Sequence, residues 1–228
     1  ASNGSGAGVS STAIAVASSG RSHQEFRNRY AFAALRSDGS VVTWGDSAYG
    51  GDSSAVAAAL NNSSNKVTQI FSTQYAFAAL RSDGSVVTWG NSAYGGNSSD
   101  VAAALSNSSN KVTQIFSTYS AFSALRSDGS VVTWGHSSNG GNSSDVAAAL
   151  NNSSNKVTQI FSNYGAFAAL RSDGSVVTWG DYGSGGDSSA VAAALNNSSN
   201  KVTQIFSTGY AFAALRSDGS VVTWGYSD

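Results

Sequence analysis

The chain of 228 residues contains no cysteine, no proline and no methionine. Without cysteine, disulfide bonds, thiolate chemistry and cysteine-ligated metal sites are excluded. No apolar stretch of about 18 residues occurs, so we expect no transmembrane helix. Apolar residues nevertheless make up 41% of the chain, which is enough for a packed interior.

Charged residues are also scarce. The chain has 12 Lys and Arg against 13 Asp and Glu, and its formal net charge is -1. Proteins that bind nucleic acid or anionic membranes concentrate positive charge on one face, and no dense basic stripe exists here. The composition therefore argues against a nucleic-acid partner and against membrane insertion.

The usual signatures of catalysis are missing as well. The only two histidines are His23 and His136, and no G-x-S-x-G sequence accompanies them. No His pair has zinc-binding spacing, and no phosphate loop or dinucleotide-binding motif occurs. We therefore expect a protein that is not an enzyme and that needs neither a cofactor nor a metal.

The chain does contain a repeated sequence motif of fifteen residues, AFAALRSDGSVVTWG, which first begins at Ala31. It recurs, with a single change, at Ala76, Ala121, Ala166 and Ala211, always 45 residues further on. A fixed period of this size indicates a repeat architecture, either a closed propeller or an open array.

The segment from Lys66 to Lys111 represents one period. Its β-branched and aromatic residues 66–72 predict a first strand, and residues 76–82 predict a second. Asp83-Gly84 is expected to form a two-residue hairpin turn, after which residues 85–90 form a third strand. Each period thus begins with a three-stranded antiparallel meander.

This turn sets the expected register. In the first copy it would place Leu35 opposite Val42 and Ala33 opposite Trp44. Both faces of the sheet are then largely apolar, whereas a sheet on a single core has one polar face. Sheets of this kind must be covered on both sides, as propeller blades are.

A helix is expected after the meander. Two copies begin with Asp52 or Asp187, and two begin with Asn97 or Asn142 followed three residues later by an Asp. Each copy thereby keeps one carboxylate near the first turn, which a helix dipole favours and a strand does not explain. We predict a helix of about ten residues that packs on its blade.

The predicted fold is mainly β: a five-bladed propeller of three-stranded meanders, each with a short helix. It forms one domain over residues 1–228, with units 31–75, 76–120, 121–165 and 166–210. Residues 211–228 and 1–30 would share the fifth unit and close the ring, with Ser10–Val16 replacing the helix and Ser22–Phe26 the strand. In the alternative, residues 1–30 are a linker and the array is open.

The repeated hairpin resembles a known family. Val67 to Ile70, Ala78 to Leu80 and Asp83 to Gly90 are similar to the repeats of the regulator of chromosome condensation family, which build β-propellers. About half of each unit shows the likeness. The family's usual G-Q-L-G after Trp-Gly is replaced by Gly-Gly-Asp-Ser-Ser, and the period of 45 is shorter. The resemblance implies the fold, and no residue matches an exchange or chromatin-binding site.

Differences among the copies gather in two loops, one after Trp-Gly and one before Ala-Phe. In a meander both loops lie at the same end, opposite the nearly invariant Asp-Gly turns. Loop sequences also vary without any functional reason where packing does not constrain them. If the variation is functional, exposed aromatic and amide side chains suit a sugar or a protein surface. The candidate ligand-binding residues are Tyr49, Tyr75, Tyr94, Tyr119, His136, Asn139, Tyr164, Tyr182, Tyr210 and Tyr226.

Two hypotheses follow for the function. The first is a binding module without catalytic activity that recognises a glycan or a protein through this variable rim. The second is a structural segment of a larger surface protein or assembly with no small-molecule ligand. The abundance of Ser, Asn, Gly and Ala, with little Lys, predicts an extracellular or cell-surface location.

Overall fold

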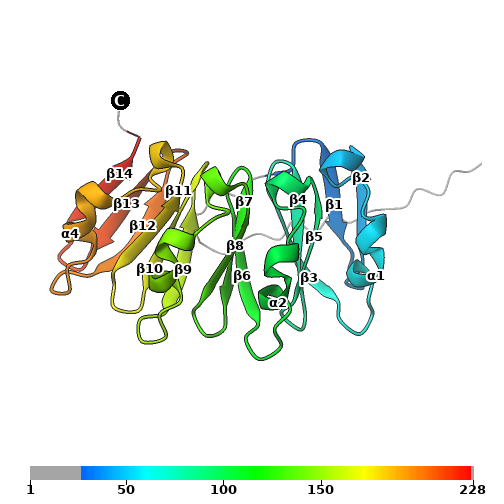
Figure 1. Ribbon diagram of the computed structural model, residues 1–228, viewed down its shortest axis with the longest axis horizontal. Coiled ribbons are helices and arrows are strands. Elements are labelled where there is room, and N and C mark those ends of the chain that lie inside the picture. The colour runs from blue at the N-terminus through cyan, green and yellow to red at the C-terminus, as the bar shows by residue number, and fades with distance from the viewer. Residues whose placement is uncertain (1–26, 227–228) are drawn as a thin grey trace, which may run out of the picture.

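The computed structural model describes residues 27–226, which form five antiparallel sheets standing in a row (Figure 1). None of the helices in this part of the chain has the length and hydropathy needed to cross a membrane. The strands are β1 (Ala31–Leu35), β2 (Val41–Gly45), β3 (Val67–Ser72), β4 (Ala76–Arg81), β5 (Val86–Gly90), β6 (Val112–Ser117), β7 (Ala121–Arg126), β8 (Val131–Gly135), β9 (Val157–Ser162), β10 (Ala166–Arg171), β11 (Val176–Gly180), β12 (Val202–Ser207), β13 (Ala211–Arg216) and β14 (Val221–Gly225).

The sheets confirm the predicted meander. β3-β4-β5, β6-β7-β8, β9-β10-β11 and β12-β13-β14 are three-stranded, and β1-β2 forms a two-stranded sheet. The first strands of successive sheets adjoin one another, β3 beside β6, β6 beside β9 and β9 beside β12. Each 45-residue unit therefore supplies the hairpin of one sheet and the first strand of the next, so that successive sheets are interlocked along the chain.

The predicted hairpin register is wrong by one residue. Leu35 pairs with Val41, and Phe32, not Ala33, pairs with Trp44. The Arg36 N–H donates to the Ser40 carbonyl, which leaves a three-residue loop that ends at Gly39 with φ +85°. Three-residue hairpins have a glycine in this left-handed conformation, and the Asp-Gly pair was misread as a two-residue turn. Both faces remain largely apolar, as predicted.

The predicted helix is shorter than expected. A 3-10 turn is followed by a single α-helical turn of four residues. The start is as predicted, because the Asp52 and Asn97 side chains accept the N–H two residues further on, at 2.8 and 2.9 Å. The α turns are α1 (Ala57–Leu60), α2 (Ala102–Leu105), α3 (Ala147–Leu150) and α4 (Ala192–Leu195), and the 3-10 turns before them are η2 (Ser54–Val56), η4 (Ser99–Val101), η6 (Ser144–Val146) and η8 (Ser189–Val191).

In three of the four copies, the residue that follows this helix makes a contact with the sheet. In the first copy, Asn61 follows α1, and its side-chain oxygen accepts the Val41 N–H of β2 at 3.0 Å. Asn151 makes the equivalent bond to Val131 at 3.1 Å. The second copy has Ser106 in this place, which donates to the Ala102 carbonyl instead, and its helix ends at the same position. The Asn contact therefore joins the helix end to the strand, and the helix is short because a 3-10 turn stands where its first turn was predicted.

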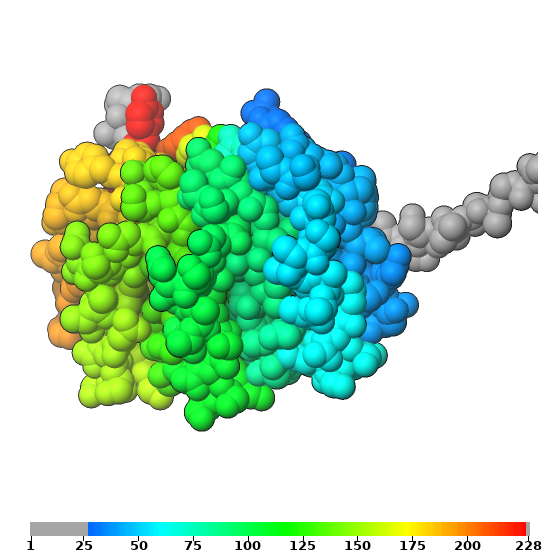
Figure 2. All heavy atoms as spheres, turned by 45° about the vertical axis from the view of Figure 1, so that its right-hand side comes forward, coloured from blue at the N-terminus to red at the C-terminus, as the bar shows by residue number. Residues whose placement is uncertain are grey.

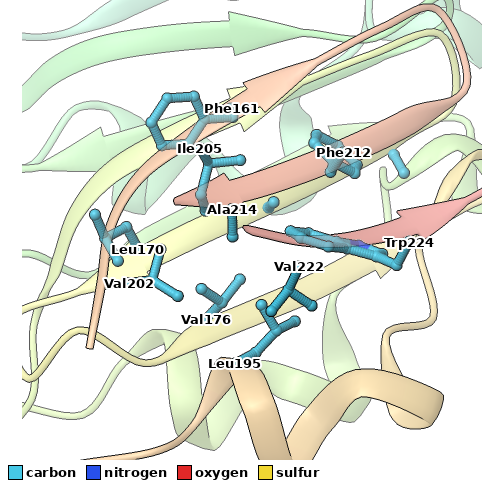
Figure 3. Packing of buried hydrophobic residues seen from close by; sticks show 12 residues of the cluster. Phe161, Leu170, Val176, Leu195, Val202, Ile205, Phe212, Ala214, Val222 and Trp224 are labelled. Carbon is cyan, nitrogen blue, oxygen red and sulfur yellow. The ribbon is translucent and has the colours of Figure 1, made fainter. Parts of the chain in front are cut away.

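Four apolar cores fill the spaces between neighbouring sheets. Between the fourth and fifth sheets, Phe161, Leu170 and Val176 meet Phe212 and Trp224 (Figure 3). α4 contributes a further buried leucine to this core, and the other three cores repeat the arrangement. The prediction that each sheet is covered on both faces is therefore confirmed for the three inner sheets.

Among the residues that the structure describes, the first and last sheets are each covered on one face only. Trp44 is 50% exposed on the first sheet, and Val221 is 59% exposed on the last. Figure 2 shows the repeats side by side, from the blue and cyan sheets to the yellow ones. Within residues 27–226 these two outer faces are not packed against each other, and closure of the ring stays a prediction.

The fifth sheet obtains all three of its strands from residues 202–225. In the prediction, residues 22–26 take the place that β3 has in the next copy, so they would add a first strand to the two-stranded sheet β1-β2. The proposed roles of Ser10–Val16 and Ser22–Phe26 lie outside the described residues. Sharing of one unit by the two chain ends stays a prediction.

The turn aspartates make the stability of the fold depend on pH. At Asp83, partial burial raises the carboxyl pKa, but hydrogen bonds from the Ser85 hydroxyl and N–H outweigh it and lower the pKa below 3.8. Asp128 and Asp173 behave alike. A pKa depressed by folding stabilises the protein above the unfolded-state value of about 3.9.

We therefore expect the free energy of unfolding to fall as the pH drops below about 4 and through the folded-state pKa values. Replacing Asp83, Asp128 and Asp173 together with Asn removes the titrating groups but keeps the acceptor oxygens, so the pH dependence should flatten. Urea unfolding at neutral and acidic pH measures both effects. If the free energy of unfolding fell equally with pH in the wild type and the variant, the pH dependence would not come from these three aspartates.

Candidate interaction surface

The two variable loops of each repeat lie side by side, as predicted. The N–H of the residue after Trp-Gly donates to the carbonyl of the residue before Ala-Phe, for example from Asp46 to Tyr30 and from Asn91 to Tyr75, both at 2.9 Å. His136 bonds Ser120 in the same way. These loops form one rim of the row of sheets, at the end opposite the Asp-Gly turns.

One side chain per repeat ties the two loops together from below. The buried Thr73 hydroxyl donates to the Tyr94 carbonyl at 3.1 Å and accepts the Ala76 N–H at 3.0 Å. Asn163, also fully buried, donates to the Ser184 carbonyl at 2.6 Å. Buried and satisfied polar groups of this kind hold the rim in one conformation before any partner arrives.

Aromatic rings run along this rim from the first sheet to the last. The Tyr75 ring lies 4.6 Å from Tyr94 and 5.5 Å from Tyr119, and Tyr119 lies 4.7 Å from Tyr164. His136 stacks on Tyr94 at 5.8 Å. We call the whole set the rim ladder: Tyr30, Tyr49, Tyr75, Tyr94, Tyr119, His136, Tyr164, Tyr210 and Tyr226.

The centre of the ladder carries a direct hydrogen bond between two phenols. The hydroxyl oxygens of Tyr75 and Tyr119 are 2.5 Å apart. This bond, together with desolvation, raises the pKa of Tyr75 to about 12. The Tyr75 phenol therefore keeps its proton at neutral pH and offers a neutral hydroxyl group.

Most of the predicted site residues belong to this ladder, but two do not. Asn139 lies beneath the rim, where its side-chain oxygen accepts the Ser120 hydroxyl at 2.9 Å. Tyr182 stands apart, 78% exposed, and makes no ring contact that the described residues show. The sequence prediction therefore located the rim but treated anchored and free side chains alike.

Two residues at the rim were missing from the prediction. Tyr30 is 41% exposed and stacks on Tyr49 at 4.6 Å, which makes it the first member of the ladder. The Arg29 guanidinium lies 5.9 Å from the Tyr30 ring centre, within cation–π range. Comparison of the copies could have found Tyr30, because it occupies the same place as Tyr75.

The charged and titratable side chains of the described rim residues take part in local structure. Within residues 27–226, no group of three His, Asp or Glu side chains is placed to hold a metal ion. The rim carboxylates are used in local structure: Asp46 accepts the Ala48 N–H, and Asp181 accepts the Ser184 hydroxyl. The arrangement can make aromatic contacts and hydrogen bonds from phenol groups.

Comparison with known proteins shows the fold. No protein-family model and no curated protein matches the chain. Similar solved structures include human WBSCR16 (20% identity, TM-score 0.51), Prp20p from Saccharomyces cerevisiae (17%, 0.54) and the receptor kinase CR4 ectodomain from Physcomitrella patens (16%, 0.52). The likeness covers 87–88% of this chain, and 60%, 56% and 51% of those chains respectively.

The chain therefore spans little more than half the length of these proteins. Prp20p is yeast RCC1, so the structural likeness agrees with the resemblance found in the repeats. The fold of residues 27–226 is that of RCC1-like propeller repeats.

Proposed function

We propose that this protein is a binding module without catalytic activity, and that its rim ladder contacts a partner protein. The observation that carries the proposal is a continuous set of aromatic rings that crosses all five sheets at the rim where the copies differ most. Aromatic residues, tyrosine above all, are enriched at protein interfaces because they combine an apolar body with a polar tip.

The stacking in the ladder favours a protein over a glycan. A sugar needs an open ring face to lie against, and the rings of Tyr75, Tyr94 and Tyr119 each lie close against neighbouring rings, tilted or edge-on. A stacked row of this kind is rigid, so little side-chain entropy is lost on binding a protein surface.

The structural neighbours are consistent with a protein partner. The work on Prp20p describes its binding to Gsp1p and to histones, and a second structure shows yeast RCC1 bound to Kap60. Those partners belong to those proteins. They support only the general idea that a propeller of such repeats serves as a platform for protein recognition.

Glycan recognition remains a second candidate because of one residue. Tyr182 has an open ring, 78% exposed, next to the Asp181 carboxylate. An exposed tyrosine beside an acceptor is a suitable platform for a sugar. The three other complete copies carry Ser at this position, namely Ser47, Ser92 and Ser137, so Tyr182→Ser tests it without disturbing the fold.

The repeats themselves supply substitutions that the fold already tolerates. We expect the combined change Tyr75→Ser, Tyr94→Asn and Tyr119→Gln to weaken partner binding by at least about tenfold, because tyrosines at an interface often contribute more than about 1 kcal/mol each. Other copies carry Ser120, Asn139 and Gln74 at these positions. Partners captured by wild-type and variant protein are compared by quantitative mass spectrometry, then titrated as purified proteins.

A matched change at the opposite end serves as the control. Ser63 is exposed, in the loop whose Asn65 bonds the Asp83 turn, so Ser63→Lys should leave binding unchanged. Loss of binding in Ser63→Lys but not in the rim variant would place the site elsewhere. A glycan array bound through Tyr182 alone would favour the second candidate. If the wild-type protein bound neither a partner protein nor a glycan, the purely structural hypothesis would be favoured.

A further inference from the structure

The two end sheets expose side chains whose counterparts are buried or partly buried at the internal interfaces. On the first sheet, Phe32 and Trp44 stack at 5.2 Å and are 61% and 50% exposed. Their counterparts Phe77 and Trp89, one repeat later, are both 4% exposed. We call the apolar side of the first sheet that carries Phe32 and Trp44 the N-face.

The last sheet exposes the opposite kind of face. Val221 is 59% exposed and Phe206 is 42% exposed, whereas Val176 and Phe161, one repeat earlier, are 4% and 8% exposed. We call this side of the last sheet the C-face. Its side chains are those that each preceding sheet turns toward the next one.

The internal interfaces show what covers each face. Between the fourth and fifth sheets, Phe161 and Val176 of a C-type face pack against Phe212 and Trp224 of an N-type face (Figure 3). The chain makes this pairing four times. The exposed C-face and N-face are therefore the two halves of an interface that this sequence already forms.

The backbone hydrogen bonds along the rim also run in one direction, from each sheet to the next. The Gln74 N–H donates to the Tyr119 carbonyl, the Tyr119 N–H to Tyr164 and the Tyr164 N–H to Gly209, at 2.9–3.0 Å. The Arg29 N–H begins the run with a bond to Gln74. Within residues 27–226, the Gly209 N–H finds no further carbonyl of this kind, and the Arg29 carbonyl finds no such donor.

We propose that the C-face of one copy of this chain docks on the N-face of a second copy, so that the repeat continues from molecule to molecule. The Gly209 N–H of the first copy then reaches the Arg29 carbonyl of the second. The contact is heterologous, because two different surfaces meet, so it extends to a ring or a filament unless one face is blocked.

The docked interface is weaker than the internal ones. Each internal core also buries a helix leucine of the preceding sheet, Leu60, Leu105, Leu150 or Leu195. Among the described residues, no helix follows β14 to play this part. We therefore expect an association that is reversible and depends on concentration, rather than a permanent oligomer.

Two variants separate the two faces. In Trp44→Lys the N-face carries a charge that would be buried on docking, and in Val221→Lys the C-face does. Both side chains are already about half exposed or more, so the fold should persist, which circular dichroism checks. Sedimentation velocity over a range of concentrations should show assembly of the wild-type chain and only monomer for each variant alone.

Mixing the variants gives the decisive result. The intact C-face of Trp44→Lys meets the intact N-face of Val221→Lys, so an equimolar mixture should form a dimer with one copy of each and nothing larger. Tyr182→Lys, a control with an equally exposed side chain away from both faces, should assemble like the wild type.

Three outcomes would overturn the proposal. The full wild-type chain could remain monomeric at every concentration. Either single variant could still form a dimer, which would indicate a symmetric contact of like faces. The mixture could stay monomeric although both variants are folded.

Discussion

Replacing Trp134 with Ala is expected to lower the free energy of unfolding by about 3–5 kcal/mol. The Trp134 indole is 4% exposed in the core between the second and third sheets, and it stacks on Phe122 at 5.2 Å. Its Nε1 donates to the Gly95 carbonyl of the preceding repeat at 3.1 Å. The change leaves a cavity and removes the one donor that residues 27–226 offer to that carbonyl, two costs that add.

Trp44→Ala provides the matched control, because it is the same substitution at the equivalent position of an end sheet. Trp44 is half exposed, so we expect a loss of no more than about 1 kcal/mol. Urea unfolding of dilute protein, followed by circular dichroism, compares the two. Equal losses would mean that the Trp134 core contributes no more than an exposed surface.

Replacing Gly140 with Ala is expected to destabilise the fold by about 2–5 kcal/mol, from backbone strain together with overpacking. Gly140 has φ +95°, a conformation that side-chain-bearing residues rarely adopt. A β-carbon there would also lie 2.6 Å from the Phe167 ring, which is fully buried. The ring cannot retreat, because it is stacked on Trp179 at 5.2 Å.

Gly209→Ala is the control for Gly140→Ala. Gly209 does not have a positive φ, and a β-carbon there would meet no atom within 4 Å. We expect a change between zero and a gain of about 1 kcal/mol, because alanine restricts the unfolded chain. Thermal and urea unfolding measure both variants. A loss in Gly209→Ala as large as in Gly140→Ala would contradict the steric explanation.

Comparison of the copies predicted most of the local structure. The period, the three strands and the aspartate or asparagine caps all follow from residue types whose preferences are local. The register did not follow, because Asp38-Gly39 suits both a two-residue and a three-residue hairpin, and only the Arg36–Ser40 pairing distinguishes them. The helix length did not follow either, because a 3-10 turn stands where the first turn of the α-helix was predicted.

The candidate site was predicted in outline only. The sequence placed both variable loops at one end, which the hydrogen bonds between them confirm. It could not show that Thr73 and Asn163 anchor these loops, because one repeat position holds different residues there. It also could not show that the tyrosines stack into a ladder, since ring contacts depend on the spacing of neighbouring sheets.

The sequence by itself determined the repeating unit, because strand pattern and turn chemistry operate over a few residues and recur every 45. Only the tertiary structure decided how the units are joined and where the row stops. Every sheet has two apolar faces, so each needs a neighbour on both sides, and the sequence implies this equally for all of them. Within residues 27–226, the packed structure shows that the first and last sheets lack one neighbour each, which leaves two complementary faces exposed.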